Sequence, residues 1–209
     1  MLAALGLAGC GGGARHDANE PSGNFPVAVS TAMFPASQRL AEHTHLVLAV
    51  RNAGSETIPN IAVTICNVTC RYPAPPGEGT DAAAFAQVLR MPGLANPSRP
   101  VWIVDRPPGE CNAGCRPGST GSGSPGGAVT AYSNTWALGA LAPGQTARFD
   151  WAVTPVAPGR HVVAWEVAAG LNGKARAVTS SGALPHGTFT VTVHTAPAQT
   201  YVNDNGQIR

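Results

Sequence analysis

Two neighbouring stretches of alternating large apolar residues constrain the fold of this chain most. Period-two alternation of this kind is typical of a strand with one buried face. An Ala-Pro-Gly turn precedes each stretch, at 142–144 and 157–159. The sequence therefore predicts two central strands that bury one face each. The residues expected in the core are Phe149, Trp151, Val163 and Trp165.

The connection between these two strands, Thr154–Arg160, has seven residues and contains Pro155 and Pro158. A tight hairpin favours two residues such as Asn-Gly, and proline cannot donate to a sheet ladder. We therefore expect the connection to arch from one sheet to a facing sheet, although a hairpin with a wide loop also fits. The 25 glycines and 19 prolines suit an all-β chain with many turns. The predicted fold class is a β-sandwich.

The first ten residues, MLAALGLAGC, are apolar and end in a cysteine, Cys10. They resemble the lipobox of bacterial lipoproteins, whose cysteine is lipidated and becomes the mature N-terminus. No lysine or arginine precedes the apolar run, as a secretion signal would normally have, which would fit a start codon further upstream. The resemblance implies an extracytoplasmic protein that is held at the membrane by lipid on Cys10.

The rest of the chain divides by composition. Residues 11–24 are Gly-rich and polar, which is typical of a flexible linker. We expect the folded domain over 25–195, with a long insertion at 71–127 and a polar tail at 196–209. Within the insertion the pattern favours a short helix over Asp81–Leu89 and a strand over Val101–Asp105. After the Asn172-Gly173 turn, Lys174–Val178 is expected to pair back on the preceding strand.

Two short motifs carry a family resemblance. The segment Val50–Gly54 and the segment Leu141–Gln145 resemble turns of the bacterial cell-adhesion-related Ig-like family (CARDB). The resemblance covers residues 40–70 and 128–195. It implies an Ig-like β-sandwich of two antiparallel sheets, used as an extracytoplasmic module of adhesion or scaffolding type. The family has no common catalytic residues.

The four cysteines after Cys10 form two pairs of equal spacing, Cys66-x3-Cys70 and Cys111-x3-Cys115. In an exported protein these cysteines are expected to be oxidised to disulfides. Two long-range disulfides would tie the insertion to the sandwich and stabilise it by roughly 4 kcal/mol, whereas two local bridges would contribute about 2 kcal/mol each. A four-thiolate metal site also fits the spacing. We favour at least one long-range bridge, and expect no metal.

Other candidate chemistry is sparse. The pattern His43-x-His45 places two imidazoles on one face of a strand, but no third metal ligand is apparent, and two surface histidines are the simpler interpretation. No Gly-x-Ser-x-Gly elbow and no phosphate-binding glycine loop are present. A net charge of +2 with only 11% charged residues gives no electrostatic case for nucleic acid.

These observations favour a non-enzymatic, lipid-anchored Ig-like module for protein interaction or envelope scaffolding. Its expected partners are the membrane, through Cys10, and an envelope protein or surface polymer. We expect no cofactor. The alternative is a ligand- or metal-binding accessory lipoprotein of a transport or secretion system, and a hydrolase ranks third. An aromatic cleft near Trp102, formed by the insertion, would favour binding.

Overall fold

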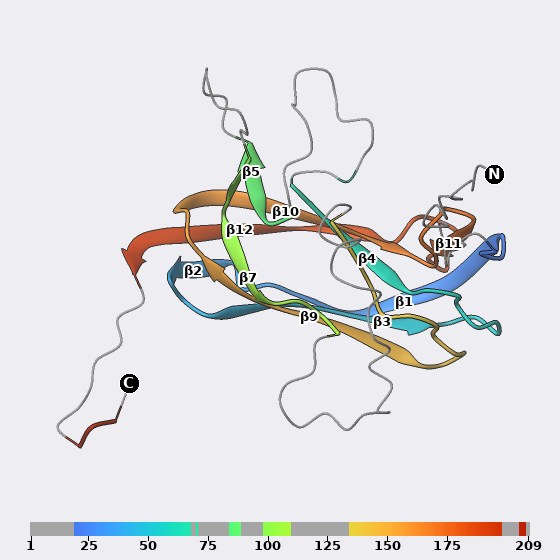
Figure 1. The fold of residues 1–209 in the computed structure, drawn as a ribbon. Coiled ribbons are helices and arrows are strands. Elements are labelled where there is room, and N and C mark those ends of the chain that lie inside the picture. Colours follow the sequence, from blue (N-terminus) through green and yellow to red (C-terminus); the bar gives the residue numbers. More distant parts are fainter. Residues whose placement is uncertain are drawn as a thin grey trace, which may run out of the picture.

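The structure is a computed structural model that describes residues 19–67, 70, 84–88, 98–109, 134–197 and 205–207. Within these ranges there is no helix, and the strands form two five-stranded sheets and a two-stranded ribbon (Figure 1). The first sheet has the order β11 (Ala175–Val178), β1 (Gly23–Met33), β3 (Thr44–Asn52), β9 (Thr146–Pro155) and β7 (Trp102–Arg106). The second has the order β2 (Ser37–Leu40), β12 (His186–Pro197), β10 (Gly159–Ala168), β4 (Ala62–Asn67) and β8 (Thr135–Ala137). The ribbon pairs β5 (Ala86–Val88) with β6 (Ser98–Pro100).

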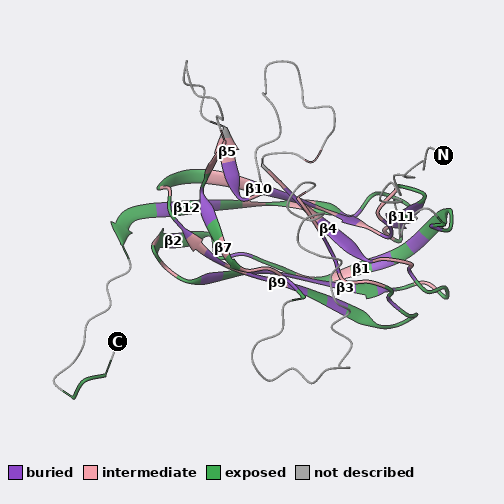
Figure 2. Cartoon of the chain, in the orientation of Figure 1, coloured by how far each residue is buried: buried purple, intermediate pink, exposed green. Residues whose placement is uncertain are grey.

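The two central strands belong to different sheets, which confirms the predicted arch between them. β9 lies in the first sheet and β10 in the second. Phe149 and Trp151 are fully buried, and Val163 and Trp165 are 2% and 7% exposed. All four join one apolar cluster to which both sheets contribute. Along β9, buried residues alternate with exposed or intermediate ones (Figure 2), as expected for a sheet with one face on the core. The fold is therefore an Ig-like β-sandwich.

Each sheet differs from the predicted antiparallel arrangement at one edge. β11 pairs with β1 in parallel, and β2 pairs with β12 in parallel. The expectation that Lys174–Val178 would pair back on β10 is wrong, because the chain crosses to the first sheet after β10 and Ala175–Val178 lies beside β1. The other strand pairs of the two sheets are antiparallel.

The described part of the insertion is folded onto the sandwich. The predicted helix over Asp81–Leu89 is wrong where it can be seen: Ala86–Val88 is the strand β5, and Phe85 has a φ of 63°, outside the right-handed helical region. The predicted strand near Val101–Asp105 is confirmed as β7, which pairs with β9. Trp102 is 3% exposed rather than lining an aromatic cleft.

Trp102 also links the two sheets through a polar contact. Its indole Nε1 donates to Oε1 of Gln38 at 2.7 Å, and the Gln38 amide donates in turn to the carbonyl of Pro35 at 2.9 Å. Gln38 lies on β2 in the second sheet and is 1% exposed. Both polar groups are thereby satisfied inside the core, where an unpaired group would be costly.

Candidate functional site

The two family-like motifs meet at one buried side chain, Asn52 at the end of β3. Its Nδ2 donates to the carbonyls of Glu56 and Leu141, both at 2.8 Å. Its Oδ1 accepts from the amide of Gly54 at 3.0 Å. Asn52 is 1% exposed, so these bonds are shielded from water. The Asn52 side chain therefore joins segments that are 89 residues apart in the sequence.

The second motif forms a tight turn that fits against the first. The amide of Gln145 donates to the carbonyl of Ala142 at 3.1 Å, and Gly144 has a φ of 76°. Proline followed by a positive-φ glycine is the pattern of a type II turn. The backbone of Asn52 then accepts from the amide of Gly144 at 3.0 Å and donates to the carbonyl of Gln145 at 2.9 Å. Both motifs are thus accounted for by structure rather than by chemistry at a site.

A second buried polar side chain, Glu20, fixes the N-terminal segment. Its carboxylate accepts from the backbone amides of Leu171, Asn172 and Ala175 at 2.7, 3.0 and 2.7 Å. Burial raises the pKa of Glu20, but these backbone hydrogen bonds outweigh it, and the net pKa lies below its ordinary value. The carboxylate also fills the space beside Gly170, where any Cβ would collide with it.

The predicted linker therefore gives way to ordered structure before Phe25. Glu20 is docked, and Gly23 and Asn24 already pair with β11. The chain enters the sandwich at the end of β3 that carries Asn52, since Val27 on β1 pairs with Asn52.

The outer face of the first sheet carries a polar strip that spans β3, β9 and β7. Because Phe149, Trp151 and Val153 on β9 point into the core, the residues between them face outward. We call this set of side chains the histidine strip. Its members are His43, His45, Asp105, Arg148, Asp150 and Thr154.

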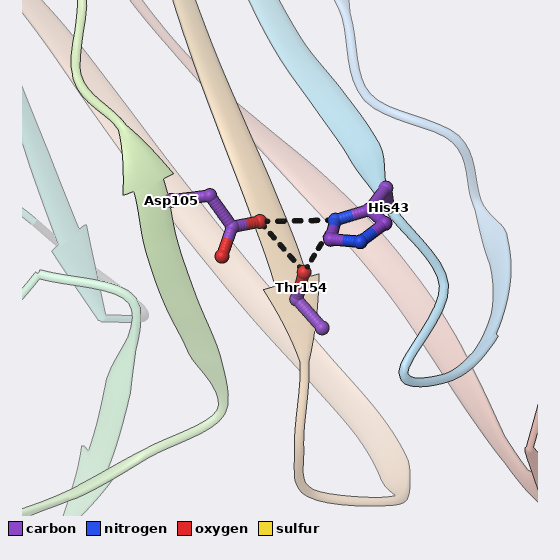
Figure 3. A network of polar contacts seen from close by, with 3 residues as sticks. All are labelled: His43, Asp105 and Thr154. Atoms are coloured by element: carbon purple, nitrogen blue, oxygen red, sulfur yellow. Dashed lines mark hydrogen bonds and ion pairs between the residues drawn. The ribbon is translucent and has the colours of Figure 1, made fainter.

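At one end of the strip, three side chains from three neighbouring segments converge (Figure 3). The Thr154 hydroxyl donates to Oδ2 of Asp105 at 2.6 Å. Nδ1 of His43 lies 3.3 Å from the same Oδ2 and 3.0 Å from the Thr154 oxygen. Because a carboxylate only accepts, and the Thr154 hydroxyl proton is already donated to it, these contacts favour the tautomer of His43 with the ring proton on Nδ1.

At the other end, His45 and Asp150 form a close pair. Nδ1 of His45 lies 2.6 Å from Oδ1 of Asp150, and Arg148 donates to Oδ2 at 3.2 Å. Burial raises the pKa of Asp150, but its hydrogen bonds and electrostatic interactions with His45 and Arg148 lower the pKa by more, so the net pKa is below its ordinary value. Asp150 therefore remains an ionised acceptor for the His45 ring.

The geometry near Thr154 differs from that of a nucleophilic triad. In a triad the imidazole bridges hydroxyl and carboxylate through its two different nitrogens. Here His43 approaches both groups through the same nitrogen, Nδ1. The nearest acceptor for the hydroxyl proton is Asp105 itself.

The structure describes one of the two cysteine pairs and therefore tests part of the predicted disulfide pattern. Cys66 and Cys70 are bonded to each other, with their Cα atoms 5.1 Å apart. The favoured long-range bridge from this pair to the second pair is therefore wrong, because the close approach of the two Cα atoms allows a local bridge that uses both sulfurs. Cys10, Cys111 and Cys115 lie outside the described residues.

Several side chains that shape these sites were not singled out in the sequence. Asp150 could have been recognised as outward-facing from its alternation with Phe149 and Trp151, but its pairing with His45 depends on the register of β3 against β9. Glu20 lies in a polar stretch that carries no signal of docking. Within the ranges the structure describes, no three His, Cys, Asp or Glu side chains gather closely enough to hold a metal ion.

Comparison with known proteins gives no family assignment. No family model matches the chain, and no curated protein matches it. Among solved structures, it is similar to α2-macroglobulin of Escherichia coli at 14% identity, covering 84% of this chain and 7% of that chain, with a TM-score of 0.40.

Two smaller domains are also similar. The CARDB domain of the PF1109 protein from Pyrococcus furiosus, in complex with di-metal ions, is 12% identical, with coverage of 84% and 90% and a TM-score of 0.38. The PapD-like domain 7 of human CEP192 is 11% identical, with coverage of 93% and 100% and a TM-score of 0.38. In the described part of this chain, no helix has the length and hydropathy to cross a bilayer.

Proposed function

We propose that this chain is a non-enzymatic, CARDB-like interaction module that is tethered to a bacterial membrane by lipid on Cys10 and faces the extracytoplasmic space. The observation that carries the proposal is the two-ended layout of the sandwich. The chain enters the sandwich at one end, where backbone amides bind the Glu20 carboxylate; we call this the clamped end. The histidine strip begins at the other end of β3. Asn52 is nine positions after His43, which corresponds to roughly 30 Å along an extended chain.

This layout suits a module tethered at its N-terminus, because it determines which end of the sandwich points away from the membrane. Ten residues from Cys10 to Glu20 can span at most roughly 36 Å. A lipid on Cys10 would therefore keep the clamped end near the membrane and leave the strip exposed to partners. The buried Asn52 supports the family resemblance, since the two motif segments are in direct contact.

The anchoring step is tested by replacing Cys10 with serine. A single acyl chain binds a membrane marginally, and two or more hold it stably. Full-length protein expressed in a bacterial host should fractionate with membranes, and Cys10→Ser should move it to the soluble fraction. Cys115→Ser serves as the matched control and should leave the distribution unchanged. Membrane association that survives Cys10→Ser would refute lipid anchoring.

The partner is sought by capture from detergent-solubilised envelopes. A photo-crosslinking residue at position 45, on the strip, should yield a defined adduct that the same residue at Asn24, exposed at the clamped end, does not. Equal adducts from both positions would contradict recognition at the strip. An accessory ligand- or metal-binding role is the second candidate, and the polar strip is the observation that favours it.

A further inference from the structure

We infer that Glu20 and the pairing of β1 with β11 form a force-bearing clamp, which transmits a pull on the N-terminal tether into both sheets of the sandwich. The inference deepens the tethering proposed above and rests on it for its role in the cell. It starts from the order of contacts along the chain. Within the described residues, a pull on the N-terminus reaches Glu20 first, then the pairing of Gly23–Pro26 with β11, and then the pairing of Val27–Met33 with β3.

The loop that binds the Glu20 carboxylate connects the two sheets. It joins the end of β10, in the second sheet, to β11, in the first. Backbone amides of this loop and of the first residue of β11 donate to the carboxylate at 2.7 to 3.0 Å. β10 in turn pairs with β12 on one side and with β4 on the other. Force that enters at Glu20 is therefore passed to an interior strand of the second sheet as well as to the edge of the first.

The hydrogen bonds at Glu20 are suited to resist such a force. An ionised acceptor makes hydrogen bonds about twice as strong as a neutral one. Glu20 is buried, so little water is present to replace the amides as they separate from the carboxylate. The donors belong to the backbone, so a change of side-chain rotamer in the loop cannot release the contact.

The direction of β1 decides how the strands share the force. β1 begins at the clamped end beside β11 and runs toward the other end of the sandwich (Figure 1). The hydrogen bonds to its two neighbours lie across the strand. A pull outward along β1 therefore acts on them side by side, and many must break together. A pull across the strand would instead open them one at a time.

Gly170 allows the loop to close on the carboxylate. Any Cβ at this position would collide with the Glu20 side chain, and the φ of Gly170 lies outside the left-handed region. Gly170→Ala should therefore dislodge the carboxylate without backbone strain and without changing its charge. Glu20→Gln removes the charge and keeps the shape of the side chain. The two variants weaken the same contact by independent means.

The test is force spectroscopy on single molecules of the full 209-residue chain carrying Cys10→Ser. In the first geometry, handles are attached at the N-terminus and, through an azide-bearing residue, in place of Val156, which is exposed and follows β9 at the end away from the clamp. In the second geometry, the N-terminal handle is moved to Ser55, which is exposed in the loop after β3 at the clamped end. Both geometries pull along the length of the sandwich, but only the first acts through Glu20.

At constant force, Glu20→Gln and Gly170→Ala should each raise the rate of the first extension about tenfold in the first geometry, because that step breaks hydrogen bonds to a charged group. In the second geometry the same rate should change far less. Glu56→Gln alters an exposed carboxylate beside Ser55 and is the control, which should change neither rate.

The inference is overturned if the two variants accelerate extension equally in both geometries, since that is the result of a general loss of stability, or if they change neither rate. The handles replace the lipid in this experiment, so its outcome is independent of Cys10. A chain without a lipid anchor could still show the clamp, and a lipid-anchored chain could lack it. The clamp and the lipid anchor are therefore refuted by different results.

Discussion

At the scale of single residues, buried polar side chains fix this fold as firmly as its aromatic ones. Asn52 satisfies three backbone groups in two segments. Gln38 similarly accepts from the indole of Trp102 on the facing sheet and donates to the backbone carbonyl of Pro35. A polar group buried with all its partners specifies one arrangement, because every alternative leaves something unpaired.

Replacing Asn52 by alanine should therefore destabilise the domain strongly. Two backbone carbonyls and one backbone N–H lose their partner in the Asn52 side chain. Each group left unpaired costs about 1–3 kcal/mol unless a water molecule takes the place of that side chain. We expect a loss of at least about 2 kcal/mol in chemical denaturation. Asn24→Ala, at an exposed position on β1, is the control and should change little. A loss for Asn52→Ala no larger than for the control would contradict the central role of this side chain.

Glu20 should make stability depend on pH. Its pKa is lowered in the folded chain, so the ionised carboxylate stabilises the fold at pH values above the unfolded-state pKa, about 4.3. This contribution is lost as the pH falls through the lower folded-state pKa. The stability difference between the wild type and Glu20→Gln should be full at pH 7 and shrink in acid. Glu56→Gln, an exposed control, should show no such trend. If the stability difference between the wild type and Glu20→Gln were constant with pH, stabilisation by hydrogen bonds from backbone amides to the ionised Glu20 carboxylate would be excluded.

At the scale of elements, the disulfide belongs to β4 and the residues that follow it, not to the insertion. Trypsin cleaves after Arg51 and Arg71, so Cys66 and Cys70 fall on one peptide. We expect that peptide to be lighter by two hydrogens and unlinked to any other. The double variant Cys66→Ser/Cys70→Ser should lose about 2 kcal/mol, the value for a short closed loop. Recovery of a crosslink to the peptide carrying Cys111 would show that the local bridge is incorrect.

The strands themselves could be predicted where alternation is long and clean, as in β9, β10 and β12. The short edge strand β2 gives no sequence signal, because Ser37–Leu40 has too few residues to show a period. The apolar residues around Phe85 have helical spacing and so predict a helix, whereas pairing with β6 decides the conformation of this segment. The partners of β11 and of His45 depend on which strands become neighbours, and local pattern does not encode this.

At the scale of the whole molecule, the two sheets share one core. Trp151 stands on the first sheet and packs edge-on against Trp136 of the second, with ring centroids 5.5 Å apart. Trp165 stands on the second sheet and covers Gly187 of the neighbouring strand so closely that a Cβ there would collide with it. Trp151 therefore contributes to the contact between the sheets, whereas the contact of Trp165 with Gly187 lies within the second sheet and places the indole in the shared core.

Either Trp151→Ala or Trp165→Ala should lower the free energy of unfolding by about 3–5 kcal/mol, as expected for a large aromatic removed from a core. The loss should appear as one cooperative transition by tryptophan fluorescence and by circular dichroism, because the sheets have no separate cores. Replacing the exposed Val156 by alanine is the control. Losses below about 1 kcal/mol at both tryptophans would be incompatible with the facing-sheet arrangement.

The docking of Glu20 also constrains the order in which this chain can mature. A polypeptide is made from its N-terminus, yet the amides that receive Glu20 lie 151 to 155 residues later. Until that loop has been synthesised, β1 lacks its parallel neighbour, and the clamped end of the sandwich cannot close. Topologies dominated by such distant pairings fold in milliseconds to seconds rather than microseconds. The edge of β1 that pairs with β11 consequently stays unpaired until the last third of the chain has been made.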